Sequence, residues 1–135
     1  MIMPSDVIFD SSYVLGFIIQ PRKTILELDM AISPQHRHYH APTHGEAFCY
    51  TKSFLIFKVT EYRSIDLKPK VYFDGDRLAD FGNLDSIGIK DELCTIVGDF
   101  GKISMRASSV DEIAENDPTW QSAFNRFGST QEIRA

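Results

Sequence analysis

A period-two pattern in residues 24–32 (TILELDMAI) constrains the fold more than any other feature of the chain. Successive side chains of a β-strand point to opposite faces of the sheet. One face of such a strand would carry Leu26, Leu28, Met30 and Ile32. The other face would carry Ile25, Glu27, Asp29 and Ala31. This alternation is typical of a half-buried β-strand, and we predict one here.

Strand-like segments recur along most of the chain. Residues 12–20 (SYVLGFIIQ) are rich in β-branched and aromatic side chains, and a turn at residues 21–23 would join them to residues 24–32 as a hairpin. Further strands are predicted at residues 47–60, 63–67, 71–73, 82–89, 92–97 and 102–107. Lys52 and Ser53 could divide the first of these by a bend or bulge. Short strands separated by turn signals predict a mostly β fold, an antiparallel sandwich or a partly open barrel.

The C-terminal part of the chain has a different period. Asp117 followed by Pro118 is typical of a helix start. Trp120, Phe124 and Phe127 then recur at i, i+4 and i+7, which predicts a short amphipathic helix over about residues 117–127. A helix this short does not persist alone in water, so its aromatic stripe must pack on the sheet or on a second subunit. The stripe is therefore also a candidate interface, and a homodimer is possible.

Size and charge limit the possible functions. The 135 residues fit a single domain, residues 1–135, and the net charge of −5 disfavours binding to nucleic acid or to an anionic membrane. The first ten residues lack the basic start and apolar stretch of a signal peptide. Cys49 and Cys94 lie in apolar runs, so we expect buried, reduced thiols in a cytoplasmic protein.

All four histidines lie within nine residues, at His36, His38, His40 and His44. We name residues 33–46 the histidine loop. Residues i and i+2 of an extended chain point to the same side, so His36 and His38 could bind one metal ion, with His44 or Glu46 completing a zinc-like site. The alternatives are a solvated loop whose histidines face water or cap carbonyl groups, and a pH sensor.

Other catalytic signals are weak. The chain has no nucleophile elbow, phosphate-binding loop or dinucleotide-binding glycine motif. Glu27 and Asp29 share one strand face and could act as an acid and base, although the solvent-facing side of a sheet is the simpler interpretation.

Five segments resemble small, uncharacterised bacterial β-rich domains, which include immunity-type proteins of toxin systems. The segments are SYVLGF, LELDMAIS, FLIFKV, GNLDSI and IVGDFGKISMRA, spread over roughly residues 12–107. The resemblance implies a non-enzymatic protein that binds a protein partner, for example by neutralising a toxin. An acidic chain suits a basic toxin, and no cofactor is then expected. The competing hypothesis is a metal-binding protein or metal-dependent hydrolase that uses zinc or a similar divalent metal at the loop from His36 to His44.

Overall fold

Most of the chain folds into one antiparallel sheet. The computed structural model describes residues 1–42, 44–69, 71–73 and 79–127. Six strands pair in the order β1–β2–β3–β8–β7–β6. Their bounds are β1 (Val7–Gln20), β2 (Lys23–Ile32), β3 (Cys49–Leu67), β6 (Leu84–Lys90), β7 (Leu93–Gly98) and β8 (Gly101–Ala114). A separate ribbon pairs β4 (Tyr72–Phe73) with β5 (Ala79–Asp80). The mostly β prediction is confirmed.

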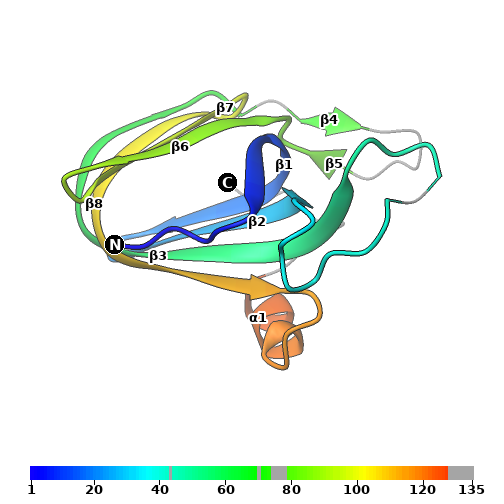
Figure 1. The fold of residues 1–135 in the computed structure, drawn as a ribbon. Helices are drawn as coiled ribbons and strands as arrows, with labels where there is room; N and C mark the ends of the chain where they lie inside the picture. The colour runs from blue at the N-terminus through cyan, green and yellow to red at the C-terminus, as the bar shows by residue number, and fades with distance from the viewer. Residues whose placement is uncertain (43, 70, 74–78, 128–135) are drawn as a thin grey trace.

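The six-stranded sheet curls into a partly open barrel (Figure 1). The segment before β6 returns to the middle of β1, where the Val14 N–H donates to the Gly82 carbonyl at 2.9 Å and the Phe81 N–H donates to the Val14 carbonyl at 2.7 Å. Residues 1–6 run along the open side, and Met1 and Met3 pack against the core there. Of the two predicted architectures, the structure is the partly open barrel.

The alternation in β2 separates two apolar clusters, as its period predicts. The side chains that face the barrel interior form the larger cluster, which includes Phe17, Leu26, Leu28, Met30, Ile32, Leu55, Phe57 and Phe100. Phe17 packs edge-to-face against Phe81 and at a tilt against Phe100, each with ring centroids 5.1 Å apart. On the outer face, Ile25 and Phe54 begin a smaller cluster that the C-terminal helix covers.

The helix α1 (Trp120–Phe127) packs on the outer face of its own sheet (Figure 1). Its Trp120 and Phe127 rings lie 4.9 Å and 6.2 Å from the Phe54 ring, measured between centroids. Phe127 is buried, whereas Trp120 and Phe124 are half-buried. The predicted helix is present and its stripe packs within the chain, although the helix begins at Trp120 rather than at Asp117.

Several strand boundaries differ from the prediction. Of the two alternatives at Lys52–Ser53, one long strand or two short ones, the structure has the single strand: β3 runs continuously from Cys49 to Leu67 and pairs with β2 without interruption at this point. β1 begins five residues earlier than predicted, at Val7, and β8 extends past residue 107 to Ala114. The turn between β6 and β7 is Asp91–Glu92, with φ angles of 50° and 66°.

Candidate functional site

The histidine loop packs against the end of β8 through His36. The His36 side chain is 3% exposed, and its Nε2 lies 3.0 Å from Oε2 of Glu112, which is 8% exposed. The His38 main-chain N–H donates to His36 Nδ1 at 3.1 Å. Because Nδ1 is the acceptor, the ring hydrogen of a neutral His36 lies on Nε2 and is donated to Glu112. Both ring nitrogens of His36 are therefore occupied.

Asp117 forms the second half of this contact. Its carboxylate accepts hydrogen bonds from the Ala114 N–H at 2.7 Å, Arg37 Nη2 at 2.7 Å and His38 Nε2 at 2.9 Å. Burial alone would raise the pKa of Asp117, but these donors outweigh it and hold the pKa below its ordinary value. Arg37 Nε also lies 3.2 Å from His38 Nε2. That nitrogen cannot accept from Arg37 while it carries the hydrogen donated to Asp117.

We name His36, Arg37, His38, Glu112 and Asp117 the histidine–carboxylate cluster. Three consecutive loop residues face two carboxylates, one at the end of β8 and one in the turn before α1. Arg37 also lies 3.5 Å from Glu112, measured from Nη2 to Oε2. The cluster therefore joins the loop to β8 and to the base of the helix. Asp117 serves this contact instead of beginning the helix, the role that the sequence predicts.

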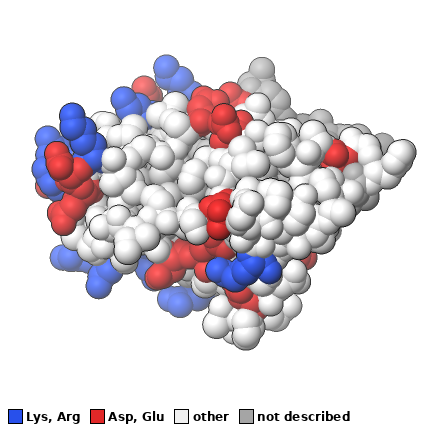
Figure 2. Space-filling model, in the orientation of Figure 1, with Lys and Arg blue, Asp and Glu red and all other residues white. Residues whose placement is uncertain are grey.

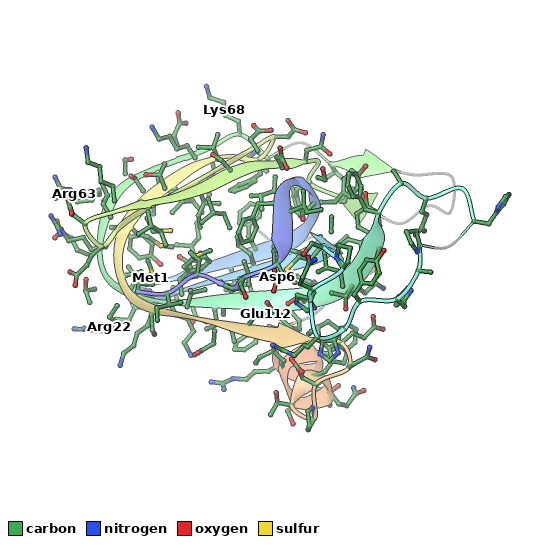
Figure 3. The ribbon with its side chains drawn as sticks, viewed as in Figure 1. Met1, Asp6, Arg22, Arg63, Lys68 and Glu112 are labelled. Carbon is green, nitrogen blue, oxygen red and sulfur yellow. The ribbon has the colours of Figure 1, made fainter. Side chains whose placement is uncertain are left out.

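A pocket of about 470 Å³ opens beside the cluster and has three walls: residues 2–6, 35–37 and 110–112. We name it the acidic pocket, because Asp6, Asp111 and Glu112 line it. Figure 3 labels Asp6 and Glu112. Asp6 and Asp111 are exposed, and neither forms an ion pair with any residue that the structure describes. The volume lies within the range of ligand-binding pockets, and the carboxylates would attract a cationic group.

Charge is unevenly distributed around this pocket. Figure 2 shows several acidic side chains in the centre of the face, with one basic group beside them in the lower centre, whereas most lysine and arginine side chains lie toward its left end. Arg22 and Arg63 lie at that left end, far from Asp6 and Glu112 (Figure 3). The surface around the pocket therefore favours approach by a positively charged group.

The predicted metal ligands are only partly brought together. The rings of His36 and His38 lie 5.7 Å apart between centroids, but each faces a different carboxylate. His44 and Glu46 are exposed. The negative charge of Glu46 helps to raise the pKa of Asp29 instead. Within the described ranges, no group of three His, Cys, Asp or Glu residues is placed to hold a metal ion.

Exposure divides the histidines into two pairs. His40 and His44 face solvent, and His40 Nδ1 lies 3.0 Å from the Ala41 carbonyl oxygen, as the solvated-loop alternative predicts. That alternative is wrong for His36, which is buried, and for His38, which is half-buried beside Asp117. The difference arises because the loop folds back onto β8.

A second polar cluster lies on the outer face of β1, β2 and β3. Glu27 is only 4% exposed, so its assignment to a solvent-facing side of the sheet is wrong. Burial raises the pKa of Asp29, and the negative charges of Glu46, Glu115 and Asp80 add to this effect against the opposing charge of Lys52. The rings of Tyr13 and Tyr50 stack nearby with centroids 6.1 Å apart, and burial also raises the pKa of Tyr50.

The cysteines are buried and free, as the sequence predicts. Burial raises the pKa of the Cys94 thiol to about 11, so this group stays protonated and unreactive near neutral pH. The Cys49 sulfur accepts the His40 main-chain N–H at 3.5 Å. The only described helix, α1, is too short and too polar to cross a membrane.

Sequence reasoning missed four residues of the site: Asp6, Asp111, Glu112 and the loop-binding role of Asp117. Each lies far along the chain from the histidines, so no local spacing connects them. Two signals were available in the sequence: the unbroken apolar block of residues 54–57 and the strand-like end of β8. These two segments pair in the sheet, and their pairing brings Glu112 to the histidine loop. Comparison of the chain with protein-family models, curated proteins and solved structures gave no match.

Proposed function

We propose that this protein is a non-enzymatic binding domain that recognises a basic protein partner, as an immunity-type protein neutralises a toxin. The observation that carries this proposal is the acidic pocket. Its exposed carboxylates, Asp6 and Asp111, form no ion pair with a described residue, and Arg37 in the pocket wall pairs with Glu112 and Asp117 instead. A lysine or arginine side chain of a partner would supply the missing charge.

Preorganisation of the pocket supports a binding role. The histidine–carboxylate cluster holds residues 35–37 against β8, and the Ser33 N–H donates to the Asp6 carbonyl at 2.9 Å. Walls that are already ordered lose little conformational entropy when a partner binds. The net charge of −5 would also speed encounter with a basic partner, in a salt-dependent way.

The hydrogen bonding of His36 supports a non-enzymatic role. A general base needs a ring nitrogen within reach of a substrate proton. Nδ1 of His36 accepts the His38 N–H, and Nε2 faces Glu112, so neither nitrogen points to a substrate position. Two buried, free thiols are typical of proteins in a reducing compartment, which supports the proposal of a cytoplasmic protein.

The test uses the protein encoded by the neighbouring gene, co-expressed and purified with this one. We expect a complex whose affinity, measured by titration calorimetry, falls at least about tenfold when Asp6→Asn and Asp111→Asn are combined. The matched control is Asp85→Asn, on β6, which is also exposed and lies outside the pocket. No complex, or equal affinity in all three proteins, would contradict the proposal.

A further inference from the structure

We propose that the partner binds as an extended, basic strand that pairs with the open edge of β8 at Val110 and Glu112. This inference rests on the proposed function and adds the mode of binding. Three observations carry it. β8 extends beyond the end of its neighbour β7, and the main-chain groups of Val110 and Glu112 that face away from β3 have no partner among the described residues. The acidic pocket lies along this stretch of the edge.

The first observation concerns the length of β8. β7 pairs with β8 only from Gly101, opposite Gly98, to Arg106, opposite Leu93. β8 then continues to Ala114 with β3 on one side only. The second half of β8 is therefore an edge strand, with β3 as its one neighbour in the sheet.

The second observation concerns the direction of the main-chain groups. The Glu115 N–H donates to the Lys52 carbonyl at 2.8 Å, so these opposite residues form a hydrogen-bonded pair. Hydrogen-bonded and non-hydrogen-bonded pairs alternate along an antiparallel ladder. Counting back from Glu115 in the register with β3, the main-chain groups of Ile113 and Asp111 therefore form hydrogen bonds to β3. The residues whose main-chain groups face the open edge are Ala114, Glu112 and Val110.

One of these three residues is already satisfied. The Ala114 N–H donates to the Asp117 carboxylate at 2.7 Å, and its carbonyl accepts the Asp117 N–H at 2.8 Å. Asp117 thus occupies the end of the edge. No residue in the described part of the chain bonds to the main-chain groups of Val110 or Glu112 on this side. Two donors and two acceptors remain, spaced as a strand would pair with them.

The third observation identifies the occupant. Val110, Asp111 and Glu112 form one wall of the acidic pocket, and residues 2–6 form another. A strand added here would carry its side chains past Asp6 and Asp111, so basic residues fit. Pairing of this edge with the same edge of a second copy would bring like carboxylates together, which is unfavourable. The charge therefore favours a basic peptide over self-association.

The probe is the synthetic peptide Lys-Val-Lys-Val-Arg-Val-Lys with blocked ends, added to the full-length protein. Amide hydrogen exchange is followed by NMR. In the free protein the Val110 and Glu112 amides should exchange quickly and the Asp111 amide slowly. With saturating peptide, exchange at Val110 and Glu112 should slow by about tenfold or more, because opening must now break the added pairing.

A variant makes the test specific to the main chain. Val110→Pro removes the N–H that faces the edge without removing a bond to β3, and it should abolish protection at Glu112. Val110→Ala shortens the same side chain, keeps the N–H and should retain protection. Loss of protection in both variants would show that the side chain matters rather than the pairing, and would overturn the inference.

The remaining outcomes separate this inference from the proposed function. Peptide binding that shifts the Asp6 and Asp111 signals without slowing exchange overturns edge pairing and leaves the basic-partner proposal intact. If the analogue peptide with Glu in place of every Lys and Arg binds as tightly as the basic peptide, both the edge-pairing inference and the basic-partner proposal are overturned. Protection that rises with protein concentration and without peptide overturns the inference in favour of a second copy, and absence of peptide binding overturns edge pairing.

Discussion

Replacing Asp117 by asparagine tests how strongly the histidine–carboxylate cluster holds the loop. Asp117→Asn keeps the shape of the side chain and an oxygen that can accept the Ala114 N–H. It removes the charge that faces Arg37 Nη2 at 2.7 Å and His38 Nε2 at 2.9 Å. We expect the loop to detach more easily from β8 and the free energy of unfolding to fall.

The structure indicates the size of this loss. A hydrogen bond to a charged group contributes about 1.5–3 kcal/mol when it is shielded from water. The Asp117 side chain is 18% exposed, but that of Arg37 is 54% exposed, so solvent screens their pair to under about 1 kcal/mol. We therefore expect a total loss of about 2 kcal/mol near neutral pH, equivalent to a fall in melting temperature of roughly 6–10 °C.

The effect should depend on pH in a defined direction. The pKa of Asp117 is lowered in the folded protein from its ordinary value of 3.8. A carboxyl group with a lowered pKa stabilises the fold above its unfolded pKa, and this contribution is lost as pH falls through the folded pKa. The difference between wild type and Asp117→Asn should therefore be full at pH 7 and shrink below about pH 4.

Urea unfolding at pH 7 and at pH 3 measures this difference. The single tryptophan, Trp120, packs on Phe54 and reports the transition by fluorescence. Asp85→Asn, an exposed replacement on β6, is the control and should match wild type at both pH values. Equal stability of Asp117→Asn and wild type at pH 7, or a difference that does not shrink in acid, would refute this account of the cluster.

Three further predictions concern other parts of the molecule. Phe127→Ala should lower the free energy of unfolding by about 3 kcal/mol and Phe124→Ala by less, measured by urea unfolding, because Phe127 is buried and Phe124 half-buried; equal losses would contradict the helix packing. Asp29→Asn should raise stability at pH 7, since burial raises the pKa of Asp29 and the ionised form disfavours folding, and thermal melts should show this gain shrinking as pH falls toward 4. Cys94, with a pKa of about 11, should react with a thiol reagent at pH 8 only after denaturant is added, and rapid reaction in the native protein would disprove its burial.

The strand pattern was predictable where a side chain's polarity matches its surroundings. The period of β2 correctly placed Leu26 in the barrel and Ile25 on the outer face. Ser53 does not match its surroundings, because it is a polar residue inside an apolar block, and a bend at this point was therefore one of two alternatives. The sheet instead satisfies its hydroxyl, which donates to the Ile113 carbonyl at 3.2 Å while the residue is fully buried. A bond partner some sixty residues away leaves no local trace in the sequence.

The site was predictable only in part for the same reason. The histidine loop could be located from composition, but the partners of His36 and His38 come from β8 and the turn before α1. Asp117 illustrates the limit, because an aspartate before proline has the same local pattern whether its carboxylate caps a helix or bonds back to Ala114. Long-range pairing between β3 and β8 decides between these outcomes.

The order of strands also bears on how the chain reaches its native state. β1, β2 and β3 form one meander, in which the segment that contains the histidine loop joins β2 to β3, and β6, β7 and β8 form another, closed by short turns. The pairing of β3 with β8 is the long ladder that joins them, besides the short contact of residues 81–83 with β1, and partners such as Ser53 and Ala114 are distant in sequence. Closing that large loop is entropically costly, so the encounter of two preformed halves should limit the folding rate. Until they meet, both halves expose long strand edges, and this is the stage at which molecules could exchange halves.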